Sequence, residues 1–231
     1  MNFANVKSIT IPEGSVKKIT AGGVVLWEKI TSRLPSEYQE VEYIQDPSGT
    51  DAHIDLGFSF VEGATIYINY IIEKNTTTYL FGAAENSGKL RCMITHTSDA
   101  EFYGSNGSSY IFLKFSRGTI RGENNFRFQL KKGALQVEDL STSEVLTNTT
   151  QAEYTMTNNL CLFGQNYNGT KRFNETIKLK SFSYYNKDDV LICDLIPCYR
   201  KSDGVIGMYD IARKIFLTNA GTGIFIKGND V

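Results

Sequence analysis

The chain has 231 residues, a formal net charge of −1, 41% hydrophobic residues and 21% charged residues. This balance is typical of a folded globular protein and excludes a disordered chain. Because the basic residues are scattered, no surface for nucleic acid is indicated. No apolar run approaches the roughly 20 residues of a membrane-spanning helix. We therefore expect neither nucleic acid nor a membrane as a partner.

Residues 1–30 have the pattern of a small N-terminal β module. Three short strand-like segments, Val6–Ile11, Val16–Thr20 and Val24–Glu28, are separated by turn sequences that contain glycine. A unit of this size is marginal in water when isolated. We therefore expect it to pack on the rest of the chain or on another protein.

Residues 31–231 have the pattern of one all-β domain. Short segments rich in Tyr, Phe, Ile and Thr alternate with polar turns, and helical periodicity is nearly absent. We expect strands at residues 38–45, 52–58, 65–72, 78–84, 89–96, 110–115, 125–130, 134–138, 154–163, 176–186, 190–197, 205–209, 214–217 and 223–227. Many short strands with regular turns predict an antiparallel two-sheet sandwich of the jelly-roll kind.

The four cysteines do not have the spacing of a zinc or redox motif. Only Cys193 and Cys198 are close together, with four residues between them. All four lie in or beside apolar strand-like segments, where a free cysteine packs as a small hydrophobic residue. We expect buried free thiols, and a Cys193–Cys198 disulfide is the less favoured alternative.

Catalytic signatures are absent from the sequence. Glu40 and Glu42 alternate with apolar residues, which predicts a solvated strand face rather than a catalytic carboxylate pair. The only histidines are His53, expected to point outward from a strand, and His96, expected in a loop. Neither has a nucleophile motif nearby. We expect no enzymatic activity.

Oxygen ligands for a metal are also sparse. Asp188, Asp189 and Asp203 are the nearest candidates for calcium, which needs several carboxylate and carbonyl oxygens. The first two, however, belong to the sequence Asn186-Lys187-Asp188-Asp189, which has the composition of a hairpin turn. We expect no metal and no cofactor.

Two polar segments carry aromatic residues suited to contact with a sugar. Residues 101–110 (EFYGSNGSSY) and 165–169 (QNYNG) combine tyrosine with amide and hydroxyl side chains. Loops on a rigid scaffold are common binding sites, although the same residues also form ordinary hairpin turns. The candidate ligand-binding residues are Tyr103, Asn106, Asn166, Tyr167 and Asn168.

The second of these segments belongs to an internal repeat. Residues 80–89 (LFGAAENSGK) and 162–171 (LFGQNYNGTK) both begin with L-F-G and continue into a polar stretch that ends in lysine. The two are either similar strand-to-loop exits of one sandwich or unrelated hairpin turns.

Several segments carry a family resemblance. They are LPSEYQEVEYIQ at 34–45, HIDLGF at 53–58, LFGA at 80–83, LFGQNYNG at 162–169, KLKSFSYYNKDDVLICDLIPCYRKSDGVIGMYD at 178–210 and FLTNAGTGIF at 216–225. Together they resemble the concanavalin-like (laminin-G-like) jelly-roll domains of phage and prophage tail or other virion structural proteins. Residues 6–29 resemble the short β module that precedes such domains.

The resemblance implies both an architecture and a role. Residues 38–45 would pair with strands from the C-terminal region, which covers exposed sheet edges. The role would be host recognition through bacterial surface polysaccharide, in a virion assembled with other virion proteins and as a homotrimer. The alternative is a purely structural fibre, tail or head decoration protein. The N-terminal sequence has no signal-peptide pattern, so synthesis in a bacterial cytoplasm is expected.

Overall fold

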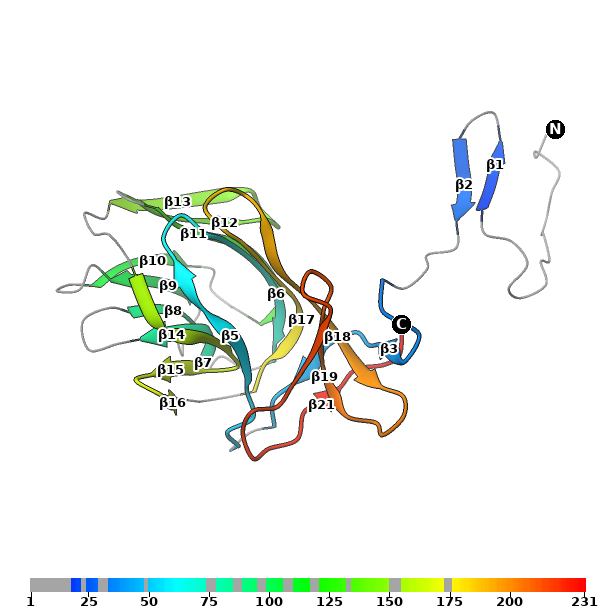
Figure 1. The fold of residues 1–231 in the computed structure, drawn as a ribbon. Helices are drawn as coiled ribbons and strands as arrows, with labels where there is room; N and C mark the ends of the chain where they lie inside the picture. The colour runs from blue at the N-terminus through cyan, green and yellow to red at the C-terminus, as the bar shows by residue number, and fades with distance from the viewer. Residues whose placement is uncertain are drawn as a thin grey trace. The chain divides into compact units, whose positions relative to one another are not determined.

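The computed structural model describes the chain in two units, Met1–Arg33 and Leu34–Val231 (Figure 1). The described residues are 18–21, 24–28, 33–47, 50–73, 78–84, 89–94, 99–105, 110–116, 121–131, 134–149, 155–172 and 176–231. Within the first unit, β1 (Lys18–Ala21) pairs antiparallel with β2 (Val24–Glu28). The strand predicted at Val6–Ile11 lies outside the described residues.

The second unit is a sandwich of two β-sheets, which confirms the predicted fold class (Figure 1). The described residues contain no helix that is long and apolar enough to cross a membrane. The eight-stranded sheet contains, in spatial order, β10 (Tyr110–Ser116), β9 (Asp99–Ser105), β8 (Lys89–Ile94), β7 (Thr78–Ala84), β14 (Thr155–Leu162) and β5 (Ile54–Val61), with β15 (Gln165–Tyr167) and β16 (Thr170–Arg172) attached.

The eleven-stranded sheet forms the other layer. Its main path is β13 (Glu144–Thr149), β12 (Ala134–Asp139), β11 (Gly122–Lys131), β6 (Thr65–Ile72), β17 (Lys178–Tyr185), β18 (Leu191–Arg200), β19 (Ile206–Asp210) and β20 (Ile215–Thr218). Three short strands join this path, namely β3 (Tyr38–Glu40), β4 (Ile44–Gln45) and β21 (Ile226–Lys227).

Aromatic side chains fill the space between the two sheets. Phe81 of β7 lies 5.7 Å from Phe128 of β11, and Phe102 of β9 lies 4.9 Å from Phe126 of β11, measured between ring centroids. All four rings are fully buried. Since successive strand residues point to opposite faces, burying these rings sends their neighbours to the outer face of each sheet.

The two ends of the second unit pair with each other, as the sequence predicts. β3 pairs with β18, with Glu40 opposite Cys198, and β4 pairs with β21, with Gln45 opposite Ile226. The predicted strand 38–45 is nevertheless broken into β3 and β4. Between them, Val41 is buried and its amide donates to Pro197 O at 3.0 Å.

The strand predictions also missed four strands of this unit, β9, β13, β15 and β16. The side chains of β13 are mostly exposed and show no apolar alternation. Its position follows instead from backbone pairing with β12, where Val137 lies opposite Leu146. Pairing with a neighbour can impose a strand on residues whose own pattern does not indicate one.

The prediction that His53 points outward is wrong. His53 is buried because the segment after β20 folds over it: the His53 amide donates to Asn219 Oδ1 at 2.9 Å, and the Ala220 amide donates to His53 O at 2.9 Å. Gly221 permits this close approach, since a Cβ there would lie 2.1 Å from Asp51 O. His96 lies outside the described residues.

The predicted free thiols are confirmed for Cys161, Cys193 and Cys198, which are buried and form no disulfide. Burial raises the pKa of Cys198 to about 12. Such thiols are unreactive at neutral pH because the nucleophilic thiolate is scarce. For Cys92 in β8, the structure describes the backbone alone.

A buried ion pair connects the two sheets. Asp210, at the end of β19, is completely buried and accepts from Arg213 Nε at 2.5 Å and from the amides of Asp194, Ala212 and Arg213. Arg213 also donates from Nη1 to Leu56 O of β5, in the other sheet, at 2.6 Å. The turn between β19 and β20 is thereby fixed to the opposite layer.

We predict that Asp210→Asn lowers the free energy of unfolding by about 3 kcal/mol, because it leaves the Arg213 cation without its partner. Urea denaturation at neutral pH would measure the loss. Burial alone would raise the pKa of Asp210, but the hydrogen bonds from Arg213 and the backbone amides lower it by a larger amount, so its pKa lies below the ordinary value. The contribution of the Asp210–Arg213 pair to stability is therefore complete above about pH 4. It is lost as the pH falls through the lowered pKa.

Asp203→Asn is the matched control. Asp203 also pairs with an arginine three residues away, at 2.6 Å from Arg200 Nη2, but both side chains are exposed. Solvent screens such a pair, so its loss should change stability little. Equal destabilisation by the two variants would contradict the proposed importance of the buried pair.

Candidate functional site

The described part of the first predicted binding segment lies in paired strands rather than in a loop. Tyr103 lies inside β9, with its backbone opposite Phe112 of β10 and Arg91 of β8. The predicted loop position of Tyr103 is therefore wrong, because backbone pairing continues to Ser105. Asn106 lies outside the described residues.

The second predicted segment is a short hairpin formed by β15 and β16. Asn166 is buried: its Nδ2 donates to Asn159 O and its Oδ1 accepts from the Gly169 amide, both at 3.0 Å. Tyr167 is half-buried, and Asn168 is exposed with a φ of 48°. The Asn166 side chain thus stabilises the turn, while all five predicted residues stay predictions as ligand contacts.

The two L-F-G segments lie side by side but differ in shape. Leu162 is opposite Phe81, and the Phe163 amide donates to Leu80 O at 2.9 Å. Residues 80–84 continue as β7, whereas Phe163, with a φ of 63°, ends β14 and redirects the chain. The sequence repeat therefore does not correspond to two equivalent loop exits.

Among the described residues of the second unit, two hollows are lined by side chains that could contact a ligand. The larger, about 400 Å³, lies between the β18–β19 turn and the segment that precedes β21. Its polar side chains already serve the fold: Asp203 pairs with Arg200, and Asn219 accepts from the amides of His53 and Gly221. Few polar groups there remain to recognise a ligand.

The smaller hollow, about 270 Å³, lies on the outer face of the eleven-stranded sheet and is lined by Thr65, Tyr67, Tyr185 and Asp189. We call it the tyrosine pocket. Tyr67 of β6 and Tyr185 of β17 are diagonal neighbours, since Tyr185 lies directly opposite Thr65. Their ring centroids are 5.7 Å apart with an interplanar angle of 74°.

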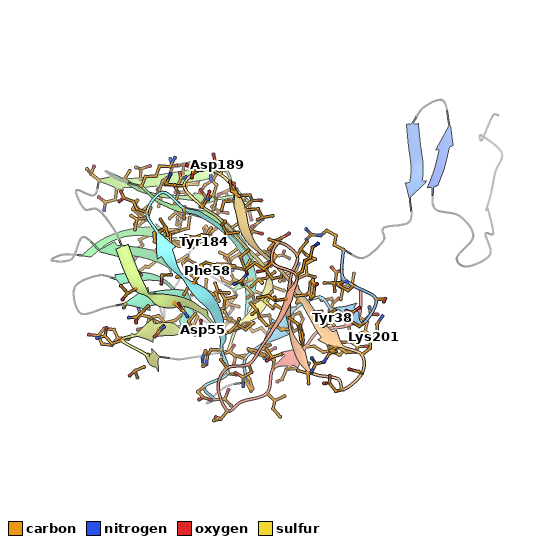
Figure 2. All side chains as sticks on the ribbon, in the orientation of Figure 1. Tyr38, Asp55, Phe58, Tyr184, Asp189 and Lys201 are labelled. Atoms are coloured by element: carbon orange, nitrogen blue, oxygen red, sulfur yellow. The ribbon has the colours of Figure 1, made fainter. Side chains whose placement is uncertain are left out.

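The inner face of β17 positions this pocket. Tyr184 packs against Phe58 with ring centroids 4.9 Å apart, and its hydroxyl accepts from the Val61 amide at 3.0 Å (Figure 2). Because Tyr184 is held in the core, Tyr185 must point to the outer face. Asp189 lies in the turn that follows β17 (Figure 2).

The functional groups of the tyrosine pocket are largely unused by the fold. Among the described residues, the hydroxyls of Tyr67 and Tyr185 and the carboxylate of Asp189 have no hydrogen-bond partner. Thr65 is buried and accepts from Gln129 Nε2 at 2.8 Å, so its hydroxyl hydrogen can still donate. The pocket thus combines two aromatic walls with several polar groups that can bond a ligand.

The polar residues around the pocket are paired with one another. On the same sheet face, Arg127, opposite Tyr67, forms a salt bridge with Glu138 at 2.7 Å. In the adjacent turn, Lys187 pairs with Asp188 at 2.8 Å. Within the described part of the chain, no group of three His, Cys, Asp or Glu side chains could hold a metal ion.

The tyrosine pocket was not among the predicted sites, although the residue pattern of β6 and β17 indicates outward tyrosines. In the β6 sequence TIYINYII, apolar residues at every second position from Ile66 form the inward face, which places Tyr67 outward. Tyr184–Tyr185 likewise puts one tyrosine on each face of β17. An outward tyrosine on a strand is a candidate for ligand contact. What the sequence could not supply is the register that brings Tyr67 and Tyr185 together.

No family model and no curated protein matches the chain. Among solved structures, a heptameric SAP-like pentraxin from Limulus polyphemus superposes with a TM-score of 0.52 and 10% identity, over 81% of this chain and 95% of that one. Domains LG4–5 of the mouse laminin α1 chain give a TM-score of 0.51 and 8% identity, over 82% of this chain and 46% of that one.

A third similar structure is the CBM40 of the Ruminococcus gnavus IT-sialidase, bound to α2,3-sialyllactose. Its TM-score is 0.45 at 17% identity, over 64% of this chain and 92% of that one. At such identities the likeness concerns the fold alone. The chain thus has the laminin-G-like sandwich fold, and its function must be argued from its own residues.

We predict that Asn166→Ala lowers the free energy of unfolding by about 1–3 kcal/mol, because it removes the two hydrogen bonds that this buried side chain makes with Asn159 O and the Gly169 amide. Thermal or urea denaturation would measure this change. Thr170→Ala, at an exposed position of the same hairpin, is the control and should cost less. A stable Asn166→Ala protein with weakened saccharide binding would instead restore Asn166 as a ligand residue.

Proposed function

We propose that the chain is a non-enzymatic carbohydrate-binding protein and that the tyrosine pocket is its saccharide site. The observation that carries the proposal is the pair of outward tyrosines, Tyr67 and Tyr185, beside a carboxylate without a partner. An aromatic ring offers an apolar surface to the C–H face of a sugar, while phenol and carboxylate groups bond its hydroxyls. The volume of about 270 Å³ suits a small ligand or one residue of a longer glycan.

The biological setting that we propose is a phage or prophage virion. The support is the resemblance of several segments, residues 178–210 above all, to jelly-roll domains of virion structural proteins. In that setting the chain would be a receptor-binding or adhesion module for bacterial surface polysaccharide, made in the bacterial cytoplasm and assembled as a homotrimer with other virion proteins.

The test is binding of the purified protein to bacterial cell-wall polysaccharides and defined glycans. We predict that Tyr67→Ala and Tyr185→Ala each raise the Kd of the bound glycan at least about tenfold, or about 1.4 kcal/mol, because each removes one aromatic wall. Isothermal titration calorimetry would measure the change, and circular dichroism would verify folding.

Tyr79→Ala is the matched control, since Tyr79 is a half-buried tyrosine on β7 of the other sheet. It should leave the Kd unchanged. Loss of binding on Tyr103→Ala or Tyr167→Ala, with the tyrosine-pocket variants unaffected, would move the site to the hairpins of the eight-stranded sheet. Absence of binding to every glycan by a folded protein would reject the carbohydrate-binding proposal.

The alternative is a purely structural protein that binds only other virion proteins. It is favoured by exposed apolar side chains near the end of the chain, where Ile224 is 78% exposed and Ile226 is 49% exposed. We predict that the trimer expected for a virion fibre dissociates on Ile224→Asp, because a charge would be buried in the subunit contact. Light scattering after size exclusion would measure this, and a monomeric wild-type protein would contradict the expected trimer.

A further inference from the structure

The tyrosine pocket contains one charged residue among the described residues that line it, Asp189. Its carboxylate is not needed by the turn in which it lies. The turn is held by Asn186, whose Oδ1 accepts from the amides of Asp188 and Val190, both at 2.9 Å. The backbone of Asp189 contributes an amide bond to Asn186 O at 3.1 Å, which any residue could make.

The backbone conformation restricts which residues fit at this position. Asp189 has a φ of 56°, in the left-handed region that glycine, asparagine and aspartate adopt more readily than other residues. The conformation thus allows an aspartate without using its carboxylate, which remains available to a ligand in the pocket.

The position of this turn relative to the sheet is fixed by close packing. Gly63, in the turn between β5 and β6, abuts Lys187 so closely that a Cβ at Gly63 would lie 2.9 Å from Lys187 Cβ. The Gly63 amide also donates to Leu130 O at 2.8 Å. The turn that carries Asp189 is therefore held against the end of β6, where Thr65 and Tyr67 begin the pocket.

Among the described residues, no cation is paired with the carboxylate of Asp189. The ammonium of Lys187 is paired with Asp188 at 2.8 Å, and the guanidinium of Arg127 is paired with Glu138 at 2.7 Å. A ligand with its own carboxylate would meet Asp189 as a like charge. A ligand with a positive charge would find a carboxylate that is still unpaired.

The two tyrosines add to this preference. Their rings are nearly perpendicular, at 74°, with centroids 5.7 Å apart, so they form a corner with two aromatic faces. A cation within about 6 Å of an aromatic centroid is attracted by the ring quadrupole. Two ring faces and a carboxylate together provide the chemistry that recognises an ammonium group.

We infer that the tyrosine pocket selects saccharides that carry a protonated amine over saccharides that carry an acetamide or a carboxylate. This inference rests on the proposed carbohydrate-binding function and adds the class of sugar substituent that the site takes. Tyr67 and Tyr185 bind the amine through their ring faces, and Asp189 binds it as counter-ion.

The test uses three sets of oligosaccharides of equal length, measured by calorimetry with the full chain: β-1,4-linked glucosamine, its N-acetylated form and an oligouronate. At a pH at which the amine is protonated, we expect the glucosamine oligomer to bind at least about fivefold more tightly than the acetylated one. The oligouronate should bind most weakly.

The variant Asp189→Asn should abolish the preference for the amine while keeping binding of the acetylated oligomer. Asp189→Gly relieves the backbone and removes the same carboxylate, so it replaces Asp189→Asn if that variant fails to fold. Asp203→Asn is the matched control, because its carboxylate is also exposed in a turn but is paired with Arg200 and does not line the tyrosine pocket. This control should keep the preference.

The outcomes separate the inference from the function on which it rests. Equal binding of amine and acetamide that still depends on Tyr67 would overturn the inference and keep the saccharide site. A preference for the amine that survives Asp189→Asn, or that Asp203→Asn also removes, would show general attraction of a polycation and would overturn it too. No binding of any oligomer by the folded protein would overturn both.

Discussion

Two sheets can remove their apolar faces from water only by packing against each other, and in this chain aromatic rings fill most of that contact. Phe81 and Phe102 on one sheet meet Phe126 and Phe128 on the other, all fully buried. Burial of each such ring contributes about 1.5–3 kcal/mol, so a register shift by one residue would expose many of them at once. The outer face of the eleven-stranded sheet is therefore fixed by its inner face, and the positions of Tyr67 and Tyr185 follow from the burial of Ile66, Ile68 and Tyr184.

The most distinctive sequence segments serve the closure of this sandwich. In the segment 203–210, the carboxylate of Asp210 holds Arg213, which reaches Leu56 O in the opposite sheet. In the segment 216–225, the side chain of Asn219 bonds the His53 amide, and Gly221 allows the contact with Asp51. Residues of these motifs thus stabilise the sandwich. A resemblance that rests on them therefore indicates the fold of the chain more firmly than it indicates which ligand the chain binds.

The sequence correctly predicts those strands whose position depends on local residue patterns. Alternation of inward and outward side chains places β6 and β12 correctly, and an almost continuously buried segment places β7. The pairing of residues near the two chain ends follows from the need to cover sheet edges. Prediction from the sequence fails where contacts with distant segments determine whether a segment forms a strand or a residue is buried. β13 is a strand because β12 pairs with it, and His53 is buried because residues from the C-terminal segment cover it. The tyrosine pocket could not be predicted for the same reason: polar turn sequences are visible in the sequence, whereas this pocket requires two strands to be placed in register.

The dimensions of the tyrosine pocket bear on how such a protein could work at a cell surface. A hollow of about 270 Å³ with two half-buried tyrosines would contact about one residue of a glycan, and exposed polar contacts contribute little affinity each. Firm attachment would then require several copies acting together, because linked weak sites gain avidity without any new contact. In the virion that we propose, repetition along a fibre or around a threefold axis would supply such copies. Under this proposal saccharide recognition and a structural role are complementary, since the assembly would provide the multiplicity that a shallow site needs.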